Sequence, residues 1–492
     1  MNDTAVSNEG NNNFQERILK NTSYLAVAFI LQKILSFLYF IYLARILGPE
    51  DLGLYDPIKS LIPILLILID FSLSVVLVRE IARKPHKAAE YLSSVLGIKV
   101  VFAFVIILIM GLFTNFSSYS TLIKTILYLD AIIVVLDTFT LTFFAVFRGL
   151  QNLKYESLGI IGTQVITIIF GVIALQQDLG LQYLFIAVAF GSIFNFIFSY
   201  SMLRKKLKLK IRLHWNIDII KRFLRIAIPF AIAAIFVKIY TFTDRFLLLL
   251  MSGQSHVGWY VTAHKLTFAL EFIPSAFAAS IFPAMSAYYM YSRTKLSKIF
   301  EKTTHYLMII AMPISFGMVI LADKIILTLY GSDFETSILP LRILISSLIV
   351  VFLNFPVGAL LNACNKQVVN TINMGIVVVI NVALNLILIK EYSFNGAAIS
   401  AFVSGFILFF LGLRWVGKII DYDKIFLLKT LGKVMGASMI MAILLYFSRE
   451  LLSIYISIPL GMVTYFVFLY LFKGISKDDL GTLYRSIRKR IA

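Results

Sequence analysis

Residues 229–251, PFAIAAIFVKIYTFTDRFLLLLM, carry Lys238, Asp244 and Arg245 within an otherwise apolar run. On a helix, the spacing of Lys238 and Arg245 places them within about 20° of each other and roughly 10 Å apart along the axis. A charge at the centre of a membrane span costs about 2.5–3.5 kcal/mol and usually faces the interior of a helix bundle. Two such cations favour the binding of an anion. Asp244 points about 120° away from Lys238, so we expect it to meet a neighbouring helix.

Other ionisable residues fall inside apolar segments, and we treat the whole set as candidate site residues. Lys33 and Lys238 lie far from both ends of their spans and have no acidic partner on their own helix. Cations near span ends have the alternative of reaching the lipid headgroups, and the acidic residues that of pairing with cations. The candidate anion-binding residues are Lys33, Lys238, Arg245, Lys265, Lys99 and Arg148, and the candidates for H⁺ or Na⁺ coupling are Asp70, Asp137, Asp244 and Glu271.

The composition indicates that these candidate residues are carried by membrane-spanning helices. Sixty per cent of the 492 residues are hydrophobic, 14% are charged, and the mean hydropathy is +0.89. Apolar windows of about 20 residues, long enough to cross a hydrocarbon layer of ~30 Å, recur along the whole chain. The sequence therefore predicts an all-α polytopic membrane protein. Cys364 is the single cysteine, which excludes a disulfide within the chain and a cysteine-based metal site.

We predict fourteen transmembrane helices, arranged as two six-helix lobes and two further C-terminal helices. Pro274 and Pro283 predict a kink or break in the eighth span. The predicted spans are 22–44, 57–78, 92–113, 121–147, 157–176, 180–203, 224–250, 260–290, 302–322, 337–363, 368–390, 394–416, 427–447 and 453–472. The corresponding regions are an N-terminal tail (1–21), a first lobe (22–203), a basic linker (204–223), a second lobe (224–416), the last two helices (427–472) and a basic tail (473–492).

The loop charges predict the orientation of these spans. The side that holds the N-terminus has 32 of the 45 Lys and Arg residues, and the opposite side has six. By the positive-inside rule, both termini, the linker and the basic tail face the cytoplasm of a multi-pass protein of the cell membrane. This distribution also accounts for the net charge of +19, so we expect no nucleic-acid partner.

Short matches on either side of the linker predict a duplication. LGLY at 52–55 is echoed by VGWY at 257–260, and residues 147–166 align with residues 361–380. Six spans per copy is an even number, so both copies insert in the same direction as parallel repeats. Binding sites in such proteins lie where the repeats meet, and we expect a central cavity there.

An ordered set of motifs resembles the polysaccharide flippases of the Wzx type, in the multidrug/oligosaccharidyl-lipid/polysaccharide exporter superfamily. The motifs are ARILGPEDLGLYDP, AVFRGLQNLKYES, TDRFLLLLMSGQSHVGWYVTAHKL, LYGSDFETSILPLRIL, ALLNACNKQ and NVALNLILIKEYSFNGAAIS. The resemblance covers almost the whole chain and implies two lobes around a cavity that opens alternately to either side. It implies a flippase for a polyprenyl-linked oligosaccharide, with polysaccharide-assembly proteins as further partners.

Two alternatives share this architecture. One is a flippase for lipid II or another cell-wall precursor. The other is a cation-coupled multidrug exporter, which the cations Lys33, Lys238 and Arg245 disfavour because organic cations need an acidic cavity. We expect no enzymatic activity, since no loop is long enough for a catalytic domain and no Walker A sequence is present. We expect no cofactor beyond a coupling ion.

Overall fold

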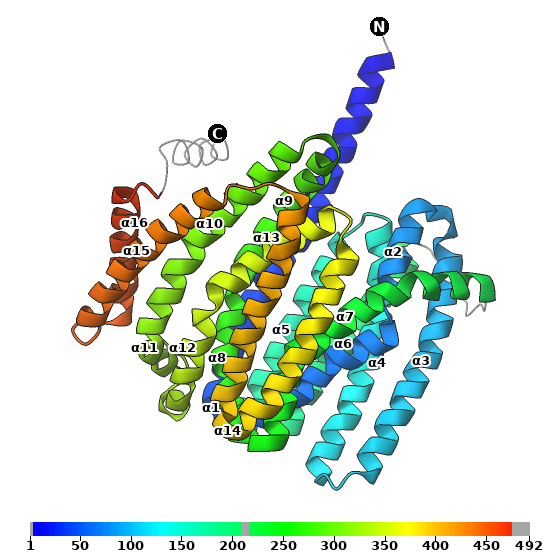
Figure 1. Cartoon of the computed structure of the whole chain (residues 1–492). Helices are drawn as coiled ribbons and strands as arrows, with labels where there is room; N and C mark the ends of the chain where they lie inside the picture. The colour runs from blue at the N-terminus through cyan, green and yellow to red at the C-terminus, as the bar shows by residue number, and fades with distance from the viewer. Residues whose placement is uncertain (1–2, 208–215, 475–492) are drawn as a thin grey trace. The chain divides into compact units, whose positions relative to one another are not determined.

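The computed structural model describes residues 3–207 and 216–474, and within these it contains helices and no strands (Figure 1). Its helices are α1 (Asp3–Asp70), α2 (Leu73–Arg83), α3 (Ala88–Phe116), α4 (Thr121–Gly149), α5 (Lys154–Gln176), α6 (Leu181–Leu207), α7 (Ile217–Ser252), α8 (Gln254–Leu270), α9 (Phe272–Tyr291), α10 (Arg293–Ile320), α11 (Ala322–Leu329), α12 (Ile338–Ser346), α13 (Leu348–Ala363), α14 (Gln367–Ile419), α15 (Lys424–Ser448) and α16 (Ile454–Leu471). Two short 3₁₀ turns, η1 (Pro85–Lys87) and η2 (Ser332–Ser337), complete the elements. The all-α prediction is confirmed.

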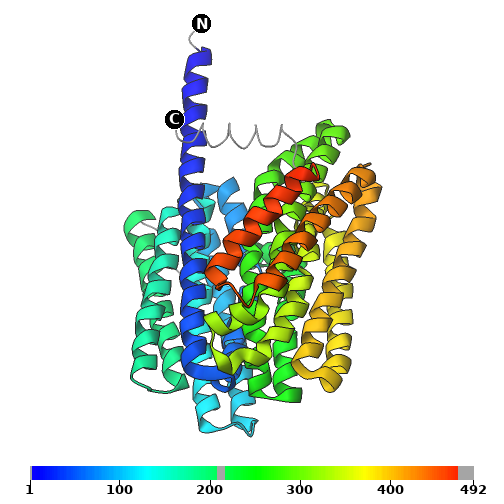
Figure 2. The same ribbon diagram turned by 90° about the vertical axis from the view of Figure 1, so that its left-hand side faces the viewer.

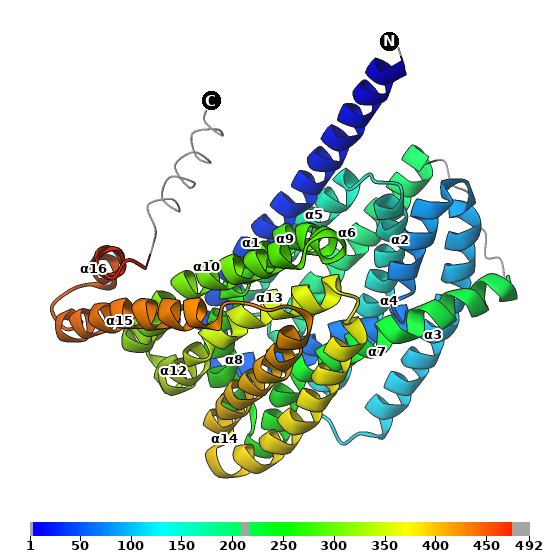
Figure 3. The ribbon, with the colours of Figure 1, turned by 45° about the horizontal axis from the view of Figure 1, so that its top comes forward.

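Twelve helical stretches within the described residues are long and apolar enough to cross a membrane. Two of them are interrupted and hold two predicted spans each: α1 at Gly48, and α14 at Ser393. Figure 2 shows the sharp turn that ends the first limb of α1, and Figure 3 shows the two limbs of α14 side by side. Counting both limbs of these helices gives the predicted fourteen spans.

Breaks interrupt the second and the eighth predicted spans. The second span changes helix at Phe71 and Ser72, both of which have positive φ, and the hydropathy did not indicate this break. The eighth breaks at Glu271, and Pro274 then lies in the first turn of α9, where a missing N–H costs no hydrogen bond. The predicted break is thus confirmed, just before the proline.

The chain divides into two compact units. Unit 1 comprises the residues up to Leu47 and Leu54–Thr243, and unit 2 comprises Gly48–Gly53 and the residues from Asp244 on. The division falls within α7, whereas the sequence places the boundary in the linker at 204–223, part of which lies outside the described residues.

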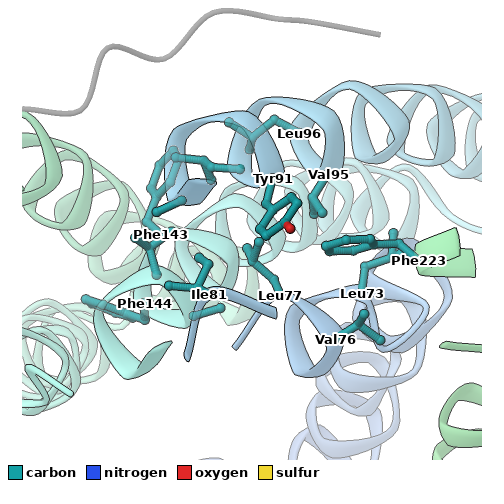
Figure 4. Close-up of a cluster of buried hydrophobic side chains, with 14 of the residues drawn as sticks. Leu73, Val76, Leu77, Ile81, Tyr91, Val95, Leu96, Phe143, Phe144 and Phe223 are labelled. Atoms are coloured by element: carbon teal, nitrogen blue, oxygen red, sulfur yellow. The ribbon is translucent and has the colours of Figure 1, made fainter. Parts of the chain in front are cut away.

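The core of unit 1 explains why the first part of α7 belongs to it. Leu73 and Leu77 of α2 and Tyr91 of α3 pack with Phe223 of α7 in one buried cluster, to which α4 adds Phe143 (Figure 4). The Tyr91 and Phe223 rings lie 5.5 Å apart, and Phe223 is 1% exposed. Burying side chains of this size stabilises the packing by roughly 1.5–3 kcal/mol each.

Two hydrophobic clusters lie in the described part of unit 2. One joins α9, α10, α13 and α14 through residues such as Met285, Phe300 and Leu360. The other packs α15 and α16 on α10, where the Tyr465 hydroxyl donates to the Ile309 carbonyl at 2.7 Å. The two C-terminal helices are therefore part of this unit.

Within unit 2, the segments Pro49–Gly53 and Gln254–Gly258 pack against each other reciprocally. A Cβ on Gly53 would collide with the Gln254 carbonyl, and a Cβ on Gly258 would collide with the Pro49 carbonyl. Each segment follows a glycine in the same left-handed conformation, Gly48 at φ 69° and ψ 179° and Gly253 at φ 95° and ψ 178°. The two places are those of the LGLY and VGWY repeats, so the duplicated motif forms a contact between its own copies.

Candidate functional site

Lys238 lies in the middle of α7, in the part of the helix that belongs to unit 1. Its side chain is half-buried, and its ammonium lies 5.7 Å from the centre of the Phe242 ring. Among the described residues, no carboxylate forms an ion pair with it. An aromatic face attracts a cation but leaves its N–H donors available to an anion. The Lys238 ammonium is therefore still able to donate to an anion, and its role in anion binding stays a prediction.

Asp244 and Arg245 follow on the same helix but belong to unit 2, and both are 4% exposed. The Asp244 carboxylate accepts hydrogen bonds from the Tyr260 hydroxyl of α8 and from the Arg245 backbone N–H, the latter at 3.0 Å. The meeting of Asp244 with a neighbouring helix is confirmed. Nη2 of Arg245 lies 3.3 Å from Nδ1 of His264, also on α8. This arrangement fixes the guanidinium beside a polar group rather than in lipid.

The remaining candidates of α1 and α8 differ in exposure. Lys33 is exposed on α1 of unit 1, whereas Lys265 and Glu271 are half-buried in unit 2. All three make further contacts. We keep all three as candidate site residues.

Lys99 and Asp70 are brought together in a buried cluster of unit 1. Lys99 is 0% exposed and forms an ion pair with Asp70. Its ammonium also donates to Ser74 Oγ at 3.0 Å and to Thr142 Oγ1 at 2.5 Å. Asp70 accepts a further hydrogen bond from Ser74 at 2.5 Å. Both charges are fully partnered, so this geometry favours a structural role and we do not retain either residue in the proposed site.

Arg148 is bound by Glu156 across the turn between α4 and α5. The guanidinium engages both carboxylate oxygens, with Nε 2.7 Å from Oε2. Glu156 is 2% exposed, so the pair is desolvated on its acidic side. A bidentate pair fixes the turn and occupies the fork that a phosphate would use. Arg148 is not retained either.

Asp137 on α4 is half-buried and lies close to Ser192 of α6.

In unit 2, the polar contacts within α14 are between neutral groups. Asn381 donates to Ser404 at 3.1 Å, and Asn385 donates to Asn381 at 3.1 Å. The first of these bonds joins the two limbs of α14, as expected of amides that hold helices together in lipid.

Sequence reasoning missed the partners of the buried charges. It did not identify Glu156 or Tyr260, and it counted Lys59 among the loop cations. Each lies within two or three turns of a predicted site residue or motif, but the sequence carries no signal for which helix faces which. Lys59 in fact lies beside the buried residues Tyr55 and Asp130.

Comparisons with known proteins agree with one another over most of the chain. The family model described as polysaccharide biosynthesis protein matches residues 18–289. The protein named probable low-salt glycan biosynthesis flippase Agl15, of Haloferax volcanii, is 24% identical over 477 residues, which cover 96% of this chain and 99% of the relative. The capsular polysaccharide biosynthesis protein CapF of Staphylococcus aureus is 22% identical over 397 residues, covering 79% of this chain and 97% of CapF.

Solved structures show the same fold. The structure titled lipid II flippase MurJ, inward closed conformation, superposes with a TM-score of 0.76 at 17% identity, covering 91% of this chain and 98% of that one. An inward-facing multidrug resistance transporter of the MATE family, in the MOP superfamily, gives a TM-score of 0.66 at 16% identity, covering 81% of this chain and 98% of the transporter. At these identities, the likeness concerns the fold.

Proposed function

Because this chain belongs to the polysaccharide biosynthesis protein family, we propose that it moves a polyprenyl-(pyro)phosphate-linked oligosaccharide from the cytoplasmic to the outer leaflet of the cell membrane. The flippase named above, which matches almost end to end, supports this function, and so does a fold shared with another lipid flippase. The positive-inside distribution supports cytoplasmic termini. Polysaccharide-assembly proteins are the partners that such a product requires.

The observation that carries the substrate class is Lys238. An ammonium in the middle of a membrane span, with no carboxylate pairing among the described residues, is costly unless it serves a ligand. A pyrophosphate supplies the missing negative charge, and the polyprenyl tail stays in the bilayer while the head group crosses. Arg245, Lys33 and Lys265 are the further proposed phosphate-binding residues. An organic cation would be repelled by the same set, which disfavours the multidrug alternative.

Transport against a gradient needs an energy source, and we propose coupling to H⁺ or Na⁺. Of the acidic candidates, Asp137, Asp244 and Glu271 remain after the pairing of Asp70 with Lys99. Asp244 accepts a hydrogen bond from Tyr260, and Asp137 lies close to Ser192. Lipid II or another cell-wall precursor carries the same pyrophosphate chemistry, so it is the second candidate substrate.

The test is a leaflet-sidedness assay in proteoliposomes with a fluorescent polyprenyl-pyrophosphate glycan. Lys238→Ala should lower the flipping rate at least about tenfold, which corresponds to a loss of ~1.4 kcal/mol in transition-state binding. Lys221→Ala is the matched control, because it removes one exposed lysine from the same helix. Equal rates for both variants would contradict the role of Lys238. Equal transport of a neutral-headed lipid would contradict the substrate class.

A further inference from the structure

Asp130 of α4 is, among the described residues, the buried carboxylate with no hydrogen-bond partner on either oxygen. It is 0% exposed, and neither of its side-chain oxygens has a hydrogen-bond partner among the described residues. Burying an ionised carboxylate without hydrogen bonds is strongly unfavourable, and such a group responds by taking up a proton. This property distinguishes Asp130 from Asp70 and Asp244, each of which accepts at least one hydrogen bond.

A cation stands near Asp130 but is held by its own helix. Lys59 of α1 interacts electrostatically with both Asp130 and Asp56. Its ammonium donates to the Tyr55 hydroxyl at 2.8 Å and lies 5.0 Å from the centre of the Tyr55 ring. Lys59 therefore does not form a close ion pair with Asp130 in this state.

Two carboxyl groups therefore lie near Lys59, and they differ in their contacts. Asp56 makes a further interaction of its own. Neither Asp130 oxygen has a hydrogen-bond donor among the described residues. An ionised Asp130 would thus be the less stabilised of the two, so Asp130 is the carboxyl group that takes up a proton.

The next titratable group along α4 is Asp137, about two turns from Asp130 on nearly the same face. The neighbouring helices place their charges as follows. Lys99 of α3 is bound to Asp70 beside Thr142, more than two turns along α4. The charged residues of α2 and α5 lie near the opposite end of α4, where Ile81 meets Gly149 and Glu156 binds Arg148. The charges of α6 begin at its far end.

We propose that Asp130, Lys59 and Tyr55 form a proton-binding site that couples proton movement to transport. We assign the observed arrangement, in which Lys59 donates to Tyr55, to the state with Asp130 protonated. Loss of the proton leaves a carboxylate that attracts the Lys59 ammonium away from Tyr55 and draws the second limb of α1 toward α4. A sodium ion fits less well, because the neighbouring ammonium repels it.

The location of Tyr55 and Lys59 gives this movement a route to the rest of the molecule. They begin the part of α1 that follows Gly48–Gly53, where the chain returns from unit 2 to unit 1. Tyr55 is buried, and its ring packs against Phe185 of α6 at 5.2 Å. A shift of this turn therefore acts directly on one of the segments that join the units covalently.

This inference rests on the proposed function, and its first test uses the same proteoliposomes with an imposed pH gradient. The measured quantity is the ratio of the flipping rates with and without the gradient. We expect a ratio several-fold above one for the wild type and for Lys59→Arg, and a ratio of one for Asp130→Asn and Lys59→Met. Asp178→Asn is the matched control: Asp178 is exposed and has positive φ, which asparagine tolerates, so the variant should keep the wild-type ratio.

A second measurement does not depend on the lipid substrate. The infrared difference spectrum of the full chain between acidic and alkaline buffer should contain the carbonyl band of a protonated carboxyl group, and Asp130→Asn should remove it. Asp178→Asn should not. If the chain moved no lipid but the band behaved as described, the proposed function would fail while the proton site would stand. The site is refuted if the band is unchanged in Asp130→Asn, if the wild-type ratio is one, or if Asp130→Asn abolishes a response to a sodium gradient.

Discussion

Two buried charge clusters of unit 1 meet the same helix, α4, and differ in how completely their charges are partnered. At Thr138 and Thr142, Lys99 has an ion pair and three further oxygen acceptors. Toward the other end of α4, Asp130 is equally buried but has no hydrogen bond within the described part of the chain. Burial alone therefore does not identify a functional charge in a membrane protein. A fully partnered charge holds helices together, and an unpartnered one is free to change its state.

The largest effect should come from breaking the partnered cluster. Lys99→Met leaves the Asp70 carboxylate buried without its cation, so we expect the free energy of unfolding to fall by about 3–5 kcal/mol. Thermal unfolding in detergent measures this change. The double variant Lys99→Met/Asp70→Asn should recover most of it, and Lys154→Met, an exposed lysine, should change little. A stable Lys99→Met protein that fails to transport would instead restore Lys99 to the binding site.

An intermediate effect is expected at the turn after α4. Arg148→Met removes two charge-assisted hydrogen bonds to the nearly buried Glu156 and should destabilise the protein by about 1.5–3 kcal/mol. Arg148→Lys keeps the charge but loses the bidentate fork, so its stability should lie between those of the wild type and Arg148→Met. The same unfolding assay applies. Unchanged stability combined with lost flipping would mean that Arg148 binds substrate, as the sequence predicted.

The smallest effect on stability is expected at the unpartnered carboxyl group. Asp130→Asn has nearly the same shape, and no hydrogen bond is lost, so its free energy of unfolding should stay within about 0.5 kcal/mol of wild type. The identical change at the partnered site, Asp70→Asn, should be clearly destabilising. If the two variants lost stability equally, the contrast between the clusters would be wrong.

The sequence predicted the membrane spans and the repeat well because both follow from local patterns. Apolar length sets a span, and the glycines of LGLY and VGWY recur where their copies touch. Helix periodicity also predicted that Asp244 points away from Lys238 and meets a neighbouring helix. That helix is α8, through Tyr260.

The pairing of charges between helices was not predictable in the same way. Periodicity gives the direction of a side chain relative to its own helix, but not which helix lies in that direction. Lys99 and Asp70 are on different elements and looked like separate candidates, while Lys59 looked like a loop residue. The first part of α7 belongs to unit 1, where Phe223 packs in the buried cluster. No local sequence pattern predicts this packing.

The reciprocal contact between Pro49–Gly53 and Gln254–Gly258 has a consequence for biogenesis. The first segment leaves the ribosome long before its counterpart exists, and at about 5–20 residues per second the wait is roughly 10–40 s. During that interval the early helices enter the bilayer while this segment has no partner to pack against. The nascent chain can therefore complete this contact only once the second copy has been synthesised.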